Sequence, residues 1–255
     1  MKSRIKSDFK KHWSVYKSQE ISIAKIAEAN SFLEPLFSFQ DKSGQKIKIL
    51  DVGCGDGVHS IALAQNNMES LYCGVDISLE AVKVAHKRIR ELNRKNFDFQ
   101  VGNVFSLPYR PDSFDVVFSY GVIAYTGMPQ MAISEMIRVS KPGGLIGIWL
   151  YPKREGVLGA AFSFTRLFCQ SLGKYSKIII YMMIPLLYFL PVRSGVNLSN
   201  STWKQCAEVI EVNLLPKTLV FYTLNDVKSW FNSRLVEAIS IDHDRPITAW
   251  VRVKK

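Results

Sequence analysis

Cysteine and histidine are scarce in this chain of 255 residues, and each shortage excludes a kind of site. The four cysteines are residues 54, 73, 169 and 206. None belongs to a Cys-x-x-Cys pair, which favours free thiols and a reducing compartment. The four histidines are residues 12, 59, 86 and 243. Their scatter has no metal-ligand spacing, so no metal site is expected.

The chain also has no segment that is predicted to span a membrane or to direct secretion. One of its two most apolar stretches, residues 178–192, is 15 residues long and contains Pro185. This is shorter than the ~20 residues that a spanning helix needs. The N-terminal MKSRIKSDFKKHW is basic but has no apolar h-region, so it is not a secretory signal. We therefore expect a cytoplasmic protein, with peripheral contact at the inner face of a membrane as the alternative.

Acidic residues are the third shortage. Lysine and arginine number 33 against 22 aspartates and glutamates, which gives a formal net charge of +11. Such a surplus can steer an acidic substrate, a membrane surface or a nucleic acid toward a protein. A solvated, lysine-rich surface has the same composition, so charge alone leaves these partners open.

Glycine, by contrast, is concentrated in one short segment, LDVGCGDGVHS at residues 50–60. The apolar run before it predicts a buried strand, and the spacing of apolar residues after it predicts a helix. Gly53, Gly55 and Gly57 lie in the turn between them, where glycine allows positive φ and lets a ligand touch the main chain. The new helix offers free N–H groups at the same place. The pattern predicts a site for a nucleotide-like ligand.

The spacing of these glycines narrows the choice of nucleotide. The G-x-G-x-x-G pattern of dinucleotide folds is absent, because the glycines are spaced G-x-G-x-G, with Asp51 two residues before the first. Asp76 ends a second predicted strand, 19 residues after Gly57. A carboxylate at that strand end can accept hydrogen bonds from both hydroxyls of an adenosine ribose.

With these residues the chain resembles the class I S-adenosylmethionine-dependent methyltransferases. The resemblance continues through FDFQVGNVFSLPYRPDSFDVVFSYGVI and EMIRVSKPGGLIGIWLYP, which are similar to the family's third to fifth strands with a Lys-Pro-Gly-Gly turn before the fifth. The family implies an α/β fold, a Rossmann-like doubly wound seven-stranded sheet that is mostly parallel with an antiparallel last strand. RPITAWVRVKK fits that last strand, and Thr223 with Asp226 fits a capping box on the helix before it.

The resemblance implies S-adenosylmethionine as the cofactor and a role for each matching residue. The glycines would pack against it, Asp51 would orient its methionine amino group, and Asp76 would bind its ribose. Asn103, where the family usually has aspartate, would lie beside the adenine, because its amide oxygen can still accept from an exocyclic amine. Ser119 and Tyr120 would close over the cofactor near the methyl group. The expected cofactor-binding residues are Asp51, Gly53, Cys54, Gly55, Gly57, Asp76, Ile77, Asn103, Val104 and Ser119.

Four regions are expected: an N-terminal helical cap (1–44), the S-adenosylmethionine-binding core (45–152), an apolar helical insertion (153–215) and a C-terminal completion of the sheet (216–255). The insertion has three interpretations. It can cap the substrate pocket, which we favour, form a dimer interface, or contact a membrane through 156–193, where flanking lysine and arginine would meet anionic lipid. Both the cap and the membrane contact imply a hydrophobic acceptor.

We therefore expect methyl transfer by in-line displacement to a small, hydrophobic or lipid-like acceptor. An alcohol or phenol acceptor would also need a general base, for which position favours Tyr120, Tyr125, Thr126 or His243. RNA is a weaker alternative, because the chain has neither [DN]-P-P-[YF] after the fourth strand nor a Pro-Cys. The rival from another class is a methyltransferase-like domain that serves as a membrane or partner scaffold.

Overall fold

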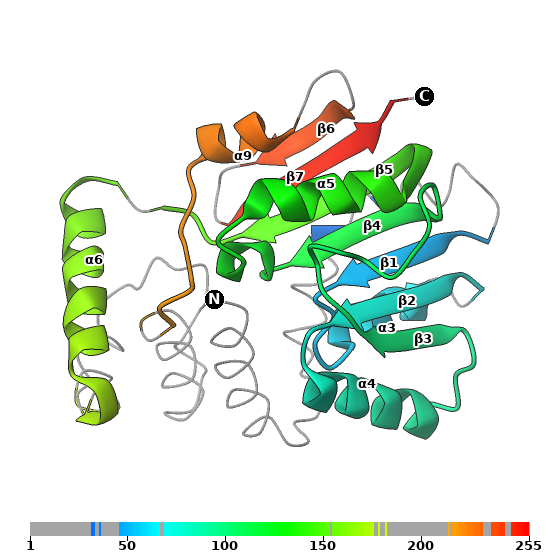
Figure 1. Ribbon diagram of the computed structural model, residues 1–255, viewed down its shortest axis with the longest axis horizontal. Helices are drawn as coiled ribbons and strands as arrows, with labels where there is room; N and C mark the ends of the chain where they lie inside the picture. Colours follow the sequence, from blue (N-terminus) through cyan, green and yellow to red (C-terminus); the bar gives the residue numbers. More distant parts are fainter. Residues whose placement is uncertain are drawn as a thin grey trace.

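The computed structural model describes most of the chain from residue 46 onward and a few residues before it. The described residues are Phe32, Leu33, Leu36, 46–66, 69–153, 155–175, Ile178, Met182, Leu214, 216–231, 236–242 and 246–254. A seven-stranded sheet forms the centre of this structure, in the order β3-β2-β1-β4-β5-β7-β6 (Figure 1). Its strands are β1 (Lys48–Val52), β2 (Leu71–Asp76), β3 (Phe97–Val101), β4 (Phe114–Tyr120), β5 (Ser140–Leu150), β6 (Val236–Asp242) and β7 (Ile247–Val253).

Strand β7 runs against its neighbours in an otherwise parallel sheet. β1 pairs in parallel with β2 and β4, β2 with β3, and β4 with β5, whereas β7 pairs antiparallel with both β5 and β6. The predicted architecture, a mostly parallel Rossmann-like sheet with an antiparallel last strand and helices, is confirmed. The strand order reverses between β1 and β4, and open α/β sheets bind their ligands at such a reversal.

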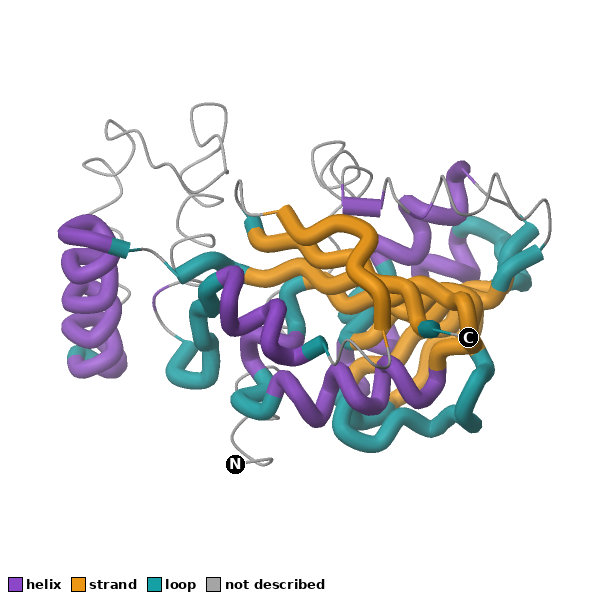
Figure 2. Tube along the Cα trace, turned by 90° about the horizontal axis from the view of Figure 1, so that it is seen from above, coloured by secondary structure: helices purple, strands orange, loops and turns teal. Residues whose placement is uncertain are grey.

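Helices cover both faces of the sheet (Figure 2). They are α3 (Val58–Asn66), α4 (Leu79–Glu91), α5 (Pro129–Val139), α6 (Gly156–Ser171) and α9 (Leu224–Trp230), with 3-10 turns η1 (Ile123–Tyr125) and η2 (Gly173–Tyr175). In β1, Ile49 packs in a cluster with residues of α3, and the next residue, Leu50, packs in a cluster with residues of α5. Successive strand residues point to opposite faces, so one apolar strand serves both layers.

The predicted Lys-Pro-Gly-Gly turn before the fifth strand is instead part of β5. Phe114 pairs with Ser140 and Val116 with Leu145, so the register shifts between them and leaves an irregular stretch in β5. Gly143 has a φ of +80° within this stretch. The backbone therefore keeps strand pairing on both sides of the turn-like residues, as a β-bulge does.

Helix α9 and Phe32 pack on opposite faces of the sheet. The capping box is confirmed, because the Thr223 side chain accepts from the Asp226 N–H and the Asp226 carboxylate accepts from the Thr223 N–H. On the opposite face, the Trp250 indole donates to the Phe32 carbonyl at 3.0 Å. Most of the expected cap of 1–44 lies outside the described residues, so the division into regions stays a prediction.

Helix α6 stands apart from the sheet, at the left of Figure 1. Most of the predicted insertion beyond residue 175 lies outside the described residues. In the part of the chain that the structure describes, every helix is too short or too polar to cross a membrane.

Candidate active site

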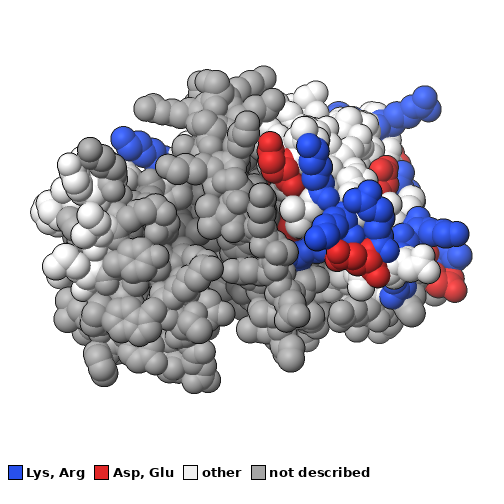
Figure 3. Space-filling view, turned by 90° about the horizontal axis from the view of Figure 1, so that it is seen from below, with Lys and Arg blue, Asp and Glu red and all other residues white. Residues whose placement is uncertain are grey.

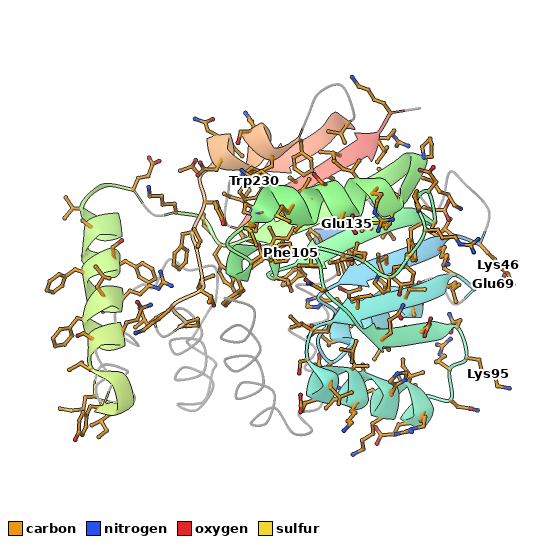
Figure 4. The ribbon with its side chains drawn as sticks, in the orientation of Figure 1. Lys46, Glu69, Lys95, Phe105, Glu135 and Trp230 are labelled. Carbon is orange, nitrogen blue, oxygen red and sulfur yellow. The ribbon has the colours of Figure 1, made fainter. Side chains whose placement is uncertain are left out.

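The predicted site residues of the first two strands meet at the carboxyl ends of β1 and β2. The arrowheads of β1, β2 and β4 point toward the side of the molecule on which α6 stands (Figure 1). Figure 4 shows Phe105 at this end of the sheet and the pair Lys46 and Glu69 at the opposite end. The loops that follow the strands therefore share one edge, as the sheet topology requires.

The turn after β1 is fixed by backbone hydrogen bonds and by close packing. Gly53 donates to the Val75 carbonyl at 2.7 Å and has a φ of +82°. A Cβ on Gly53 would lie 2.3 Å from Cγ2 of Val122, in the loop after β4. Glycine is thus required here twice, by the backbone angle and by the approach of a neighbouring loop.

The other two glycines tie the turn to β2 and β3. The Gly55 N–H donates to Oδ2 of Asp76 at 3.0 Å. Gly57 has a φ of +76°, and a Cβ there would lie 2.9 Å from Cζ of Phe99. The first turn of α3 begins directly behind Gly57, so its N–H groups face the same edge.

Asp76 is a buried carboxylate whose two oxygens organise the loops around it. Oδ2 accepts from Gly55, and Oδ1 accepts from the Ser78 N–H at 2.8 Å. Burial raises the pKa of Asp76, and these backbone N–H groups partly offset that rise by stabilising the charged form. Each carboxylate oxygen has a second lone pair, so Asp76 can still accept hydrogen bonds from a ligand.

Asp51 is buried even more completely, beneath the glycine loop. Ser60 of α3 donates to its Oδ2 at 2.9 Å. Burial raises the pKa of Asp51 to about 7, although the Ser60 hydrogen bond opposes the rise. The neighbouring Asp56 is paired with Arg88, whose Nη2 lies 2.8 Å from Oδ2 of Asp56. Two buried carboxylates, Asp51 and Asp76, therefore lie without a cationic side chain paired with them in the described part of the chain.

A pocket opens beside Asp76, at the carboxyl ends of β1, β2 and β4. Of the predicted cofactor residues, it is lined by Gly53, Asp76, Ile77, Asn103 and Val104. The structure adds Val75, Gly102, Phe105 and Val122, together with Tyr125 and Thr126, which were predicted as candidate bases. Val122 was missed because the loop after β4 has no carboxylate and no G-x-G pattern, although its place after a parallel strand was a usable signal.

Asn103 lines the pocket but part of its hydrogen-bonding capacity is already used. Its Oδ1 accepts from the Phe105 N–H at 3.1 Å, and its carbonyl accepts from the Ser106 N–H at 3.0 Å. The amide therefore shapes its own loop. The remaining lone pair of Oδ1 and the NH₂ group are what it can offer to a base.

The other predicted cofactor residues lie behind the pocket wall. Asp51, Cys54, Gly55, Gly57 and Ser119 do not line the pocket as the structure describes it. Ser119 is buried, and its hydroxyl donates to the Val52 carbonyl at 2.8 Å. Burial raises the pKa of the Cys54 thiol well above its usual range, so Cys54 is a neutral packing residue. These residues support the loops, and their predicted cofactor contacts stay predictions.

Tyr120 lies in a row of stacked rings at the end of β4. Its ring stacks on His59 at a centroid distance of 4.2 Å and on Trp149 at 4.5 Å. Tyr151 meets Trp149 edge to face at 4.8 Å. The result is an aromatic wall beside the carboxyl ends of β4 and β5.

Tyr125 connects that wall to the pocket. Burial raises the pKa of Tyr125 well above its usual range, and its neighbour Tyr151, which shares a hydrogen bond with it, raises the pKa further. The phenol is therefore protonated at neutral pH and suits a hydrogen-bond donor better than the predicted general base. Another predicted candidate, His243, lies outside the described residues.

The described residues contain no group of three or more His, Cys, Asp or Glu side chains that could hold a metal ion.

Comparison with known proteins agrees with this geometry. Residues 43–155 match the family model of a methyltransferase domain. This segment is therefore a methyltransferase domain. Norajmaline N-methyltransferase of Rauvolfia serpentina is 33% identical over 54% of this chain and 46% of its own length. Demethylmenaquinone methyltransferase of Lactococcus lactis is 33% identical over 39% of this chain and 40% of its own length. The matched segments thus span less than half of these relatives.

Solved structures share the fold of the methyltransferase domain at low sequence identity. A SAM dependent methyltransferase from Aquifex aeolicus aligns with a TM-score of 0.54 and 14% identity. The alignment covers 92% of this chain and 100% of that chain. PKMT2 from Rickettsia typhi in complex with AdoHcy has a TM-score of 0.60 and 14% identity, covering 82% of this chain and 49% of that chain. At such identities the likeness concerns the fold.

The residues of the methyltransferase domain fit S-adenosylmethionine on their own chemistry. Asp51 and Asp76 are buried, and a ligand with an amino group and ribose hydroxyls offers the positive charge and the donors that such carboxylates bind. Gly53 leaves the pocket wall free of a side chain, and Ile77 and Val104 give it apolar surface. These features together match an amphipathic nucleoside ligand.

Proposed function

We propose that this protein transfers the methyl group of S-adenosylmethionine to a small apolar acceptor. The observation that carries the proposal is the joint position of Gly53, Asp76 and Asn103 around one pocket at the strand-order reversal. When bound, S-adenosylmethionine supplies a sulfonium methyl group that a nucleophile on the acceptor displaces in line, which leaves S-adenosylhomocysteine.

The residues of the pocket divide the work of holding this cofactor. Asp76 would accept from the ribose hydroxyls, and Ile77 and Val104 would pack on the adenine. Asn103 would contact the adenine edge through its NH₂ group and through the Oδ1 lone pair that the Phe105 N–H does not use. Asp51, which is buried at the end of β1 before the glycine loop, would stabilise the bound amino group by its negative charge. This role lowers the pKa of Asp51 when the cofactor binds.

Tyr125 and its neighbours support an apolar acceptor. Tyr125 and Thr126 line the pocket on the β4 side, and Tyr151 and Phe221 meet edge to face at 6.3 Å behind them. Aromatic rings give a large apolar contact area, and the protonated Tyr125 hydroxyl can orient a polar atom of the acceptor. The protein would thus contribute mainly by holding acceptor and methyl group in line, the entropic part of catalysis.

A transfer assay with a labelled methyl group tests the proposal. Wild-type protein is incubated with labelled S-adenosylmethionine and a panel of apolar amines, phenols and carboxylic acids, and label is counted after extraction into organic solvent. Label is expected in at least one extract, and Tyr125→Phe is expected to lower the transfer rate by about tenfold with unchanged affinity for S-adenosylhomocysteine. Binding of S-adenosylhomocysteine without transfer to any apolar acceptor would contradict the proposal and favour the scaffold alternative.

A further inference from the structure

Helix α6 has an apolar face that is open to solvent. Val157, Phe164 and Leu167 are 86%, 72% and 67% exposed. They recur at the spacing of one side of a helix, so they form a continuous stripe. We call this stripe the outer face of α6, and it consists of Val157, Ala160, Ala161, Phe164, Leu167 and Phe168.

The opposite side of α6 is the side that holds the helix to the protein. Nη2 of Arg166 donates to the carbonyls of Pro216 and Leu219 at 2.5 and 2.7 Å. Phe162 meets Phe221 edge to face at 5.4 Å, and Cys169 is fully buried. The side of α6 that packs on the protein is therefore different from its outer face, so α6 has two apolar sides.

The distribution of charge indicates what the outer face binds. α6 has no acidic residue, and its one charged residue, Arg166, is turned toward the 216–219 backbone. The stretch 156–207 contains no aspartate or glutamate, but it contains five lysines and arginines: Arg166, Lys174, Lys177, Arg193 and Lys204. In Figure 3 the described atoms at the α6 end are white apart from one basic group, whereas charged atoms of both signs gather at the opposite end. An apolar stripe in a basic segment complements an apolar surface with negative charge.

We propose that the outer face of α6 docks on an anionic lipid surface. The helix has 16 residues, fewer than the ~20 needed to span, so it would lie in the plane of the interface. Phe164, Leu167 and Phe168 would enter the boundary of the acyl chains. The basic composition of the sequence 156–207 favours an anionic lipid surface over a neutral one. A second copy of the chain is a poorer occupant, because two such basic segments would repel each other.

This orientation has a consequence that rests on the proposed function. The carboxyl ends of β1, β2 and β4 point toward the side of the molecule that carries α6 (Figure 1). Docking through α6 would therefore bring the acceptor side of the pocket near the lipid surface, where apolar acceptors partition. Lipid binding itself does not require methyl transfer, so the two proposals can fail separately.

Flotation of the full-length protein with lipid vesicles tests the docking proposal. Vesicles of phosphatidylcholine with phosphatidylglycerol are compared with vesicles of phosphatidylcholine alone. The wild type is expected to float with the anionic vesicles and to bind the neutral ones more weakly. The double variant F164S/L167S is expected to lower the partition coefficient by about tenfold or more, because two exposed apolar side chains are lost from the contact.

The matched control places the same changes on another part of the surface. Leu92 and Met131 are 50% and 51% exposed and lie at the end of α4 and on α5. L92S/M131S is expected to bind vesicles like the wild type. Unchanged circular dichroism and unchanged binding of S-adenosylhomocysteine would show that both variants are folded.

Three outcomes would overturn the docking proposal: no flotation of the wild type, equal flotation of F164S/L167S and wild type, or equal loss in the control. Dimerisation of the wild type that F164S/L167S abolishes, without vesicle binding, would assign the outer face to a second copy instead. Phe164→Trp gives an independent readout, since brominated phosphatidylcholine should quench its added fluorescence. A Leu92→Trp variant should not be quenched, and quenching of both or of neither would also contradict the proposal.

Discussion

The loop after β1 and helix α6 each begin with a glycine in the left-handed region, yet their surroundings differ completely. Gly53 has a φ of +82°, and a Cβ there would lie within 2.3 Å of Val122. Gly156 has a φ of +67°, and a Cβ there would meet nothing within 4 Å. Glycine is required at position 53 by both neighbouring atoms and the backbone angle, whereas at position 156 only the backbone angle favours it. The contrast separates a loop that is packed tightly beside the proposed cofactor pocket from a helix that is packed on one side only.

The largest expected effect comes from placing the same methyl group at these two glycines. Gly53→Ala should lower the affinity for S-adenosylhomocysteine by a factor of about 100 or more, because the loop must move away from Val122 and from the pocket. Gly156→Ala should leave the affinity unchanged and lower the stability by ~1–2 kcal/mol through backbone strain alone. Calorimetric titration and thermal unfolding of both variants measure these effects. Equal losses of affinity would show that strain rather than packing makes Gly53 necessary.

The next effect concerns two acids at opposite ends of the sheet. Asp76→Ala removes a ligand acceptor and also frees the N–H groups of Gly55 and Ser78. Affinity for S-adenosylhomocysteine should fall by ~1–3 kcal/mol, roughly tenfold to a hundredfold.

Asp115 is the matched control for Asp76, since it accepts from the Lys48 N–H at 2.9 Å and pairs with Lys141 at the far end of the strands. Asp115→Ala should lower stability but leave the affinity for S-adenosylhomocysteine unaltered. The assignment of Asp76 would be wrong if its alanine variant bound S-adenosylhomocysteine as tightly as the wild type.

A separate expected effect is a change in how stability depends on pH. The pKa of Asp51 is raised from 3.8 to about 7 in the folded protein, so folding favours the protonated form. Between about pH 4 and pH 7 the folded state binds one more proton at Asp51 than the unfolded state, and stability falls as pH rises through this range.

Asp51→Asn is neutral at every pH and keeps an oxygen that can accept from Ser60. Its melting temperature should therefore rise relative to the wild type as pH increases to about 7, with a constant difference above that. Its affinity for S-adenosylhomocysteine should fall, since the negative charge is lost. The melting temperatures of both proteins are measured from pH 4 to pH 8. A difference between them that does not change with pH would contradict the burial of Asp51 as an unpaired carboxylate.

The sequence predicted the parts of the fold and the site that depend on backbone geometry. The positive φ of Gly53 and the place of Asp76 at the end of β2 were predicted, because the glycine spacing and the strand pattern fix both. The capping box of α9 was predictable because local pattern and local structure agree there. The antiparallel direction of β7 was expected only from the resemblance to the methyltransferase family.

The remaining features depend on contacts between distant segments. Tertiary packing determines three of these features. The Oδ1 of Asn103 accepts from the Phe105 N–H, the Ser119 hydroxyl donates to the Val52 carbonyl, and burial raises the pKa of Tyr125. The Lys-Pro-Gly-Gly segment has turn chemistry, but pairing with β4 draws it into β5. The composition of α6 is that of a buried helix, and only the structure shows which of its sides is packed and which is open.

Titration of the purified protein with S-adenosylhomocysteine, with NADH as the control ligand, tests the central claim most directly. We expect binding of S-adenosylhomocysteine in the micromolar range and no heat of binding with NADH. Absence of S-adenosylhomocysteine binding, or equal binding of both ligands, would contradict the assignment of Gly53, Asp76 and Asn103 to a methyl-donor site.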